Sequence, residues 1–451
     1  MTGGWAALLL YFVGFLDPHV RVAFKPLHRL VAWTENEGEL SIRWSTGLPV
    51  YQAKAWYREY TCEGKRAELR WREVTPTLSL FFKYKVVFWE FLYTAVLRNL
   101  HSDCRYEYKV GASFHVSPTS SVSGRTPYYD PNSVKADQPA KIVVYGDMGR
   151  GYYSLPTRKF LKKYLAANSD VAAILHLGDV AYNLDYMGGT VGDEFLRDIS
   201  DIADRIPYLI TPGNHEAAHD FSHLRTRFRM PRTADNDNSG LFFSFNLGRA
   251  HFTMYSTEVY TYSSNETQQR HREWVEKDLQ AAEKRRTETP WVFVLGHRPF
   301  YCNVDWTRSM ESIKGFRSNN NCQVESPALR LEFEDMFYGF GVDMVLAGHI
   351  HRYERHAAVY ANVTVPSEAD SLNFHLNPKA AVHIISGIAG SDHEKNPLSR
   401  TPQHWNRAEA NDYGFGVLTV LNSTHLYWEQ WDAERERLID WLWVVKTQLR
   451  Y

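Results

Sequence analysis

The sequence has almost no excess charge of either sign, since 51 lysine and arginine residues are balanced by 52 aspartate and glutamate residues, giving a formal charge of -1. A nucleic-acid-binding surface needs a basic excess, so we expect no nucleic-acid partner. Recognition of an anion must then be local, and a bound metal ion can supply the positive charge. Internal repeats and low-complexity tracts are also absent, while a hydrophobic content of 44% is typical of a globular protein.

Long apolar runs are rare as well. The run at residues 5–15 is too short to span a bilayer as a helix, but it matches the core of a secretory signal peptide. No lysine or arginine precedes it and no clear cleavage site follows it, so a first strand or a truncated leader is the alternative. We expect residues 1–18 to be a signal peptide, and we expect no membrane-spanning helix later in the chain.

Cysteine is scarce, with four residues in the whole chain. They fall as one pair in each half, which predicts two local disulfides in an oxidising compartment, Cys62–Cys104 and Cys302–Cys322. Four buried thiols in a cytosolic protein are the alternative. Sequons support secretion, so we expect an extracellular or lysosomal location with glycans at Asn265, Asn362 and Asn422.

The chain changes character along its length. Segments between residues 20 and 115, such as ELSIRWST and YEYKVG, are rich in aromatic and β-branched residues and predict strands. We expect an all-β sandwich of the fibronectin or immunoglobulin kind over residues 19–116. A segment rich in Ser, Pro and Gly predicts a linker over residues 117–139. Strands and helices then alternate, which predicts an α/β domain with sheets flanked by helices over residues 140–451.

Polar residues of metal-binding types follow the apolar strands of this α/β domain. In open α/β sheets, sites form at the carboxyl ends of strands. A single aspartate after a strand is more often a helix cap or a turn residue. Capping or turn formation does not explain why polar residues of metal-binding types follow five separate strands. The residues are Asp147, Asp179, Asn214, His297, His349 and His351.

The residue types and their spacing predict a dinuclear metal site. Oxygen and imidazole donors suit Fe, Zn or Mn rather than Cu(I) or an iron–sulfur cluster. Glycine precedes most of these residues, and it permits a sharp turn and a close approach of the backbone to a bound ion. His349 and His351 are two residues apart, so both can face a metal pair separated by about 3.5–4 Å.

The motifs at these positions are GDMG (146–149), GDVAY (178–182), GNHE (213–216), VLGH (294–297) and GHIH (348–351). In this order they resemble the five blocks of the purple acid phosphatases, within the calcineurin-like metallophosphoesterases. The β domain ahead of the catalytic domain also resembles the high-molecular-weight members, and the resemblance covers roughly residues 20–450. It implies an acid phosphatase that hydrolyses phosphate monoesters.

Carried over position by position, the resemblance implies a ligand set for each metal. Fe(III) would be bound by Asp147, Asp179, Tyr182 and His351. Asp179 would bridge to a divalent ion (Zn, Fe or Mn) that is also held by Asn214, His297 and His349. Tyr182 would bind Fe(III) as a phenolate, the source of the purple colour of the family; a ring packed under the loop is the alternative.

Charge counting agrees with this ligand set. Fe(III) and a divalent ion carry five positive charges, and two aspartates with one tyrosinate supply three negative ones, so about one positive charge remains beside a bound hydroxide. The expected mechanism is in-line attack of a metal-bound hydroxide on the phosphoryl group. His215 resembles the family histidine that contacts phosphate and protonates the leaving alkoxide; a role in orienting a ligand is the alternative.

The sequence departs from the family in one segment. Plant-type members carry further phosphate-binding histidines shortly after the VxxH block, whereas residues 298–322 contain no histidine here. Arg298, Asn303 and Arg308 are candidate substitutes, and the Cys302–Cys322 disulfide would hold the loop.

Two other functions are compatible with these motifs. A metallophosphodiesterase or nucleotide hydrolase could use a Zn or Mn pair on the same core, although Tyr182 favours the Fe(III) enzyme. A non-catalytic secreted binding protein would have lost metal ligands, whereas every ligand position is filled by a suitable residue. The β domain would either contribute to a homodimer interface or narrow the access to the active site.

Overall fold

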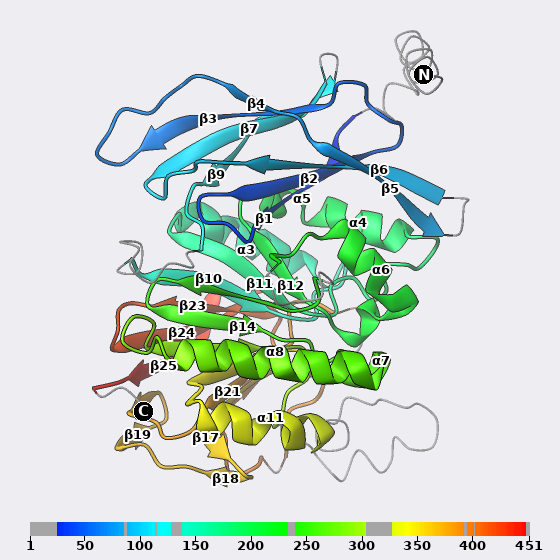
Figure 1. Ribbon diagram of the computed structural model, residues 1–451. Coiled ribbons are helices and arrows are strands. Elements are labelled where there is room, and N and C mark those ends of the chain that lie inside the picture. The colour runs from blue at the N-terminus through cyan, green and yellow to red at the C-terminus, as the bar shows by residue number, and fades with distance from the viewer. Residues whose placement is uncertain are drawn as a thin grey trace. The chain divides into compact units, whose positions relative to one another are not determined.

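The computed structural model describes residues 25–84, 88–112, 115–127, 138–232, 240–303, 327–391, 395–400 and 402–447 (Figure 1). The chain divides into two compact units. The first comprises residues 1–127, 184–208 and 225–231, and the second comprises residues 128–183, 209–224 and 232–451. The expected signal peptide, residues 1–18, lies outside the described residues.

The first unit contains two antiparallel sheets. One has the strand order β1 (Leu27–Trp33), β2 (Leu40–Thr46), β6 (Phe88–Leu97) and β5 (Thr77–Tyr84). The other has the order β4 (Arg72–Val74), β3 (Lys54–Cys62), β7 (Cys104–Ala112) and β8 (His115–Val116), with β9 (Ser120–Ser123) also paired to β7. Strand pairing therefore continues into the segment that was expected to be a linker. Helices α4 (Thr190–Asp198) and α5 (Ser200–Ala203) pack on β1.

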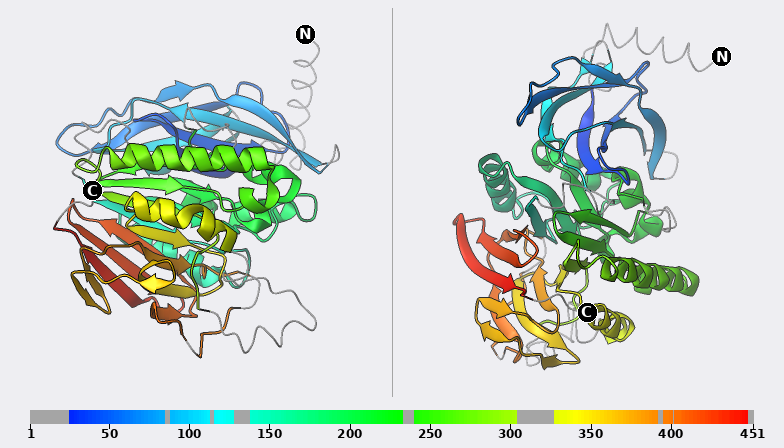
Figure 2. Two further views of the ribbon diagram at one scale, coloured as in Figure 1. Left: turned by 60° about the horizontal axis from the view of Figure 1, so that its bottom comes forward. Right: turned by 60° about the vertical axis from the view of Figure 1, so that its left-hand side comes forward.

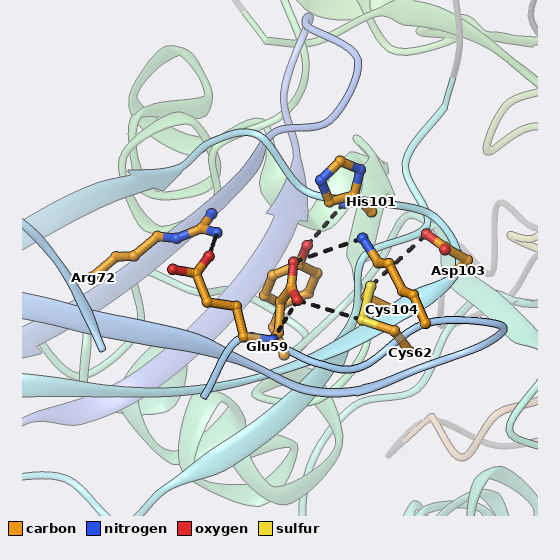
Figure 3. The surroundings of a disulfide bond; sticks show 9 residues. Glu59, Cys62, Arg72, His101, Asp103 and Cys104 are labelled. Carbon is orange, nitrogen blue, oxygen red and sulfur yellow. Dashed lines mark hydrogen bonds and ion pairs between the residues drawn. A yellow bond between two sulfur atoms is a disulfide. The ribbon is translucent and has the colours of Figure 1, made fainter. Parts of the chain in front are cut away.

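Alternation of side chains explains why these segments form sheets with one buried face. In β7, Tyr106, Tyr108 and Val110 are buried, and the residues between them are half-buried. Cys62 and Cys104 are directly paired across β3 and β7, and they form a disulfide (Figure 3). The prediction of this disulfide is confirmed, whereas Cys322 of the second expected pair lies outside the described residues.

The second unit contains two large mixed sheets. The first has the strand order β12 (Tyr208–Thr211), β11 (Val171–Leu177), β10 (Ala140–Tyr145), β23 (Gly414–Val420), β24 (His425–Asp432), β25 (Arg437–Val445), β20 (Phe374–Leu376) and β19 (Ala369–Ser371). The second has the order β13 (Phe243–Leu247), β14 (Ala250–Met254), β15 (Trp291–Leu295), β16 (Met344–Ala347), β21 (Val382–Ser386), β17 (Tyr353–Tyr360) and β18 (Val363–Thr364), with β22 (Asn406–Ala410) paired to β17.

Helices cover these sheets, which confirms the expected α/β architecture. Helix α3 (Leu155–Ala167) packs on β23, and α8 (Asn265–Glu283) packs on β14 (Figure 1). Helix α11 (Pro327–Gly339) lies beside α8 (Figure 2), and Arg272 of α8 forms an ion pair of 2.7 Å with Glu332 of α11. The shorter elements are α6 (Ala218–Arg227), α7 (Val259–Tyr262) and the 3-10 turn η2 (Asn214–Glu216).

Parallel pairing brings several strand ends to a common edge. Strands β10 and β11 are parallel, as are β14, β15, β16 and β21. Every residue of β11, β14, β15 and β16 is buried, which agrees with the continuous apolar sequences of β15 and β16. Among the described helices, none combines the length and the apolar character required to cross a membrane.

Candidate metal centre

The predicted ligands all lie in the loops that follow the strands of the second unit. Asp147 follows β10, Asp179 and Tyr182 follow β11, and Asn214 follows β12; His297 follows β15, and His349 and His351 follow β16. The structure brings these residues together as two contiguous groups of donor atoms. The first group holds three of the four residues expected around Fe(III), and the second holds the four residues expected around the divalent ion.

The first group consists of Asp147, Tyr182 and His351. The phenol of Tyr182 donates a hydrogen bond of 3.2 Å to Oδ1 of Asp147, and its oxygen lies 2.9 Å from Nε2 of His351. Nε2 of His351 is 3.4 Å from the same carboxylate oxygen. On the other side of the His351 ring, Nδ1 is 3.0 Å from Oγ of Ser391, so the serine orients the ring with Nε2 toward the other two residues.

The second group consists of Asp179, Asn214, His297 and His349. Nε2 of His297 lies 3.3 Å from Oδ2 of Asp179, 3.2 Å from Oδ1 of Asn214 and 3.2 Å from Nδ1 of His349. The remaining nitrogen of His297 is 2.7 Å from the carbonyl oxygen of Leu177, which orients that ring. One ligand atom each from Asp179, His297 and His349 lies within 4.8 Å of the other two.

Close packing of the loops joins the two groups. The backbone N–H of His349 donates a hydrogen bond of 2.8 Å to Oδ2 of Asp147, so a residue of the second group holds a carboxylate of the first. Glycine is required where these loops approach each other most closely. A Cβ atom at Gly213 would lie 2.3 Å from Oδ1 of Asp179, and one at Gly178 would lie 2.6 Å from Nδ1 of His297.

The backbone of the site is strained at several ligand positions. Asp147, Asp179, Tyr182 and His349 have φ angles of 58°, 51°, 53° and 69°, in the left-handed region that residues other than glycine seldom adopt. Such conformations cost on the order of 1–3 kcal/mol each and persist only where the surrounding structure holds them. Their concentration at the predicted ligands is typical of a functional site.

Glu216 is a residue of the site to which the sequence analysis gave no role. Its buried carboxylate accepts hydrogen bonds from the backbone N–H groups of Asp179 at 2.8 Å, Val180 at 3.0 Å and Gly213 at 2.9 Å. It therefore ties the loop that carries Asp179 to the loop that carries Asn214. The signal in the sequence was an acidic residue three positions after Gly213, the spacing of a capping residue at the start of a helical turn.

His215 lies at the edge of the second group. Its side chain is 24% exposed, and its Nε2 lies 3.8 Å from Oδ2 of Asp179. The ring packs edge-on against Tyr182, with ring centroids 4.7 Å apart. His215 is therefore both close to the predicted metal ligands and accessible from solvent.

The electrostatics of the site fit bound cations. Burial, together with Asp147 and Asp179, raises the pKa of Tyr182 well above its usual value, so an ionised phenol here requires a nearby cation. Burial also raises the pKa of Asp179, but His297, His215 and His349 lower it by more, and the carboxylate is ionised. Burial and the neighbouring His297 and Arg298 lower the pKa of His349, so its ring is neutral and can bind a metal.

The candidate substitutes for the missing histidines have different surroundings. The guanidinium of Arg298 donates to buried Glu258 through Nε at 2.8 Å and Nη2 at 3.2 Å, and its Nη1 is 3.3 Å from Nε2 of His349. The amide of Asn303 instead donates to Glu409 at 3.2 Å. Arg298 is therefore in contact with the site, whereas Arg308 lies outside the described residues.

The predicted glycosylation residues are all exposed. Asn265 is the first residue of α8, Asn362 lies in the turn between β17 and β18, and Asn422 lies in the turn between β23 and β24.

Two family descriptions match the chain. The calcineurin-like phosphoesterase family matches residues 140–353, a range that contains every predicted metal ligand. The family described as iron/zinc purple acid phosphatase-like protein C matches residues 380–441.

Individual proteins are similar over larger parts of the chain. Acid phosphatase type 7 of Homo sapiens is 38% identical over 282 residues, which are 61% of this chain and 61% of the human protein. Acid phosphatase type 7 of Danio rerio is 39% identical over 313 residues, 68% of each chain. The Fe(3+)-Zn(2+) purple acid phosphatase 12 of Arabidopsis thaliana is 26% identical over 390 residues, 84% of this chain and 75% of that protein.

The fold also occurs in solved structures of other proteins. The purple acid phosphatase PPD1 from seeds of yellow lupin (Lupinus luteus) superposes with a TM-score of 0.75 at 19% identity, covering 94% of this chain and 74% of the lupin chain.

Proposed function

The chain belongs to the purple acid phosphatase family, a family of dinuclear metal acid phosphatases, and from this premise we propose that it hydrolyses phosphate monoesters at a centre of Fe(III) and one divalent cation. The observation that carries the proposal is the position of Tyr182. Its phenol oxygen lies between a buried carboxylate and an imidazole, 3.2 Å from Asp147 and 2.9 Å from His351. A phenol in that place is suited to a hard trivalent ion such as Fe(III).

The two groups of donors would divide between the metals. Fe(III) would be held by Asp147, Asp179, Tyr182 and His351. The divalent ion would be held by Asp179, Asn214, His297 and His349, and it would be Zn, Fe or Mn; the Arabidopsis relative named for Fe(3+) and Zn(2+) supports the first of these. When bound, the ions would supply Lewis acidity toward the phosphoryl oxygens and the attacking water.

The residues of the chain would hold the substrate and move one proton. His215 is close to the ligands and partly exposed, so it can reach the ester oxygen of a bound substrate and protonate it as the alcohol leaves. Glu216 and the strained loops would keep the ligand positions in place before the metals bind, which reduces the reorganisation needed at the moment of reaction.

We also propose that the protein acts outside the cytosol, in the extracellular space or the lysosomal lumen. The disulfide between Cys62 and Cys104 and the exposed sequon residues support this location. Protein secreted from eukaryotic cells should lose mass when its N-linked glycans are removed enzymatically.

The activity is tested with protein secreted from eukaryotic cells and analysed for metals. We expect one iron and one divalent ion per chain, and hydrolysis of p-nitrophenyl phosphate that exceeds hydrolysis of bis(p-nitrophenyl) phosphate at acidic pH. A preference for the diester with two Zn or Mn ions would contradict the proposal and indicate a metallophosphodiesterase. Full activity of an Asp179→Ala variant would also contradict it, because Asp179 is assigned to both metals.

A further inference from the structure

We propose that Asn183 is a positioning residue that holds the ring of His215 with Nε2 toward the metal centre. The inference rests on the proposed phosphatase function, in which His215 protonates the leaving oxygen. It concerns a residue that neither the sequence motifs nor the ligand set includes.

The contact is a single hydrogen bond between two side chains. Nδ1 of His215 lies 3.0 Å from Oδ1 of Asn183. An amide oxygen only accepts, so the proton of this hydrogen bond is on Nδ1, and Nε2 is the nitrogen that remains for other contacts. Nε2 is on the side of Asp179, 3.8 Å from its Oδ2, a distance longer than a hydrogen bond.

Two other contacts of His215 act on its backbone and on the tilt of its ring. Its backbone N–H donates a hydrogen bond of 2.9 Å to Oδ1 of Asp179, which holds the main chain. The edge-on contact with Tyr182, at 61° between the ring planes, restricts the tilt of the ring. Rotation of a histidine ring about its last side-chain bond has two broad wells, and a half-turn places carbon atoms where the nitrogen atoms were. Only a polar partner distinguishes the two wells, and Asn183 is such a partner.

The backbone conformation of the turn explains why the side chain of Asn183 reaches His215. Asn183 has a φ angle of 80°, directly after Tyr182 with a φ angle of 53°, so two successive residues adopt the left-handed conformation. Asparagine tolerates this conformation better than most residues other than glycine. One short turn therefore directs Tyr182 toward the predicted iron ligands and Asn183 toward His215.

The consequence is a selective effect on leaving groups. Protonation of the leaving oxygen matters for an alkyl phosphate, whose alkoxide is a poor leaving group, and matters little for p-nitrophenyl phosphate, whose phenolate leaves readily. General acid catalysis contributes roughly 10²–10⁴-fold, and loss of orientation forfeits part of that factor. We therefore expect Asn183→Leu to lower kcat/KM for glycerol 2-phosphate by about 10- to 100-fold and for p-nitrophenyl phosphate by less than about threefold.

Two further variants separate positioning from general damage. Asn183→Asp keeps an acceptor oxygen in the same place, and it should retain most of the wild-type ratio of the two kcat/KM values. Asn246→Leu removes an equivalent contact, because Oδ1 of Asn246 lies 2.8 Å from Nδ1 of buried His251, outside the groups of metal ligands. It should leave the ratio unchanged. The metal content and visible spectrum of Asn183→Leu should equal those of the wild type, which shows that the ligands are undisturbed.

The outcomes are distinct. The positioning role would be overturned if Asn183→Leu kept its metals and lost activity equally on both esters. It would also be overturned if the variant lost activity on neither ester. A failure of Asn183→Asp to restore the ratio would overturn it as well. Wild-type protein that hydrolyses neither ester would instead overturn the proposed function and, with it, this inference.

Discussion

The Glu216→Gln substitution keeps the volume of the side chain but replaces one of its two acceptor oxygens with an amino group. Oε2 accepts from the backbone N–H groups of Asp179 and Gly213, and Oε1 accepts from that of Val180. Whichever way the new amide is turned, at least one buried N–H faces another donor. A buried N–H group left without its partner costs about 1–3 kcal/mol.

The loss should appear both in stability and in metal retention. We expect Glu216→Gln to lower the free energy of unfolding of the second unit by about 1–3 kcal/mol, since at least one buried N–H group loses its acceptor. The same change loosens the loops of Asp179 and Asn214, so the divalent metal should be removed by a chelator about 10- to 100-fold more readily.

The assay combines urea unfolding of the metal-depleted protein with chelator titration of the metal-loaded protein. Glu59→Gln is the matched control, because buried Glu59 also accepts a backbone hydrogen bond, from Glu68 at 2.7 Å, but lies in the first unit. It should alter stability without altering metal retention. Unchanged stability and unchanged metal retention in Glu216→Gln would refute the view that this carboxylate joins the two ligand loops.

Two further predictions concern buried charges away from the metal centre. Burial raises the pKa of Asp278, but His251 and hydrogen bonds from neighbouring hydroxyl groups lower it by more, so the net shift is downward. A carboxyl group whose pKa is lower in the folded protein stabilises the fold at pH values above its pKa in the unfolded chain. This stabilisation is lost as the pH falls through its pKa in the folded protein. Thermal unfolding of Asp278→Asn should therefore depend less on pH below about pH 4 than that of the wild type. Lys83 lies 3.2 Å from Glu90 and 2.6 Å from Asp193, with its side chain 11% exposed. Its replacement in Lys83→Met leaves both carboxylates without this cation and should destabilise the first unit by about 2–4 kcal/mol in urea unfolding, with the metal content unchanged.

Local patterns were sufficient to choose the candidate ligands, because these residues follow features that can be recognised along the chain. A buried strand that ends in glycine and then a polar residue marks the edge of a sheet, and this pattern singles out Asp147, Asp179 and His297. The structure places these residues together as two groups of donors. The β-rich first region and the α/β second region were predicted for the same reason, since periodicity is a local property.

The sequence did not indicate the long-range contacts that orient the ligands. Asn183 and His215 are 32 positions apart, and Glu216 accepts from residues 36 and 37 positions away. Such contacts depend on how loops from different strands meet, which no local pattern specifies. The same limit explains why residues 184–208 and 225–231 join the first unit although they follow strands of the second.

The visible absorption spectrum of the secreted protein tests the central claim most directly. We predict a broad band that gives a purple or pink colour, produced by the Tyr182 phenolate on Fe(III), and its loss in Tyr182→Phe with iron still present. A colourless wild-type protein that holds two metal ions per chain would contradict the account and indicate a centre of Zn or Mn instead.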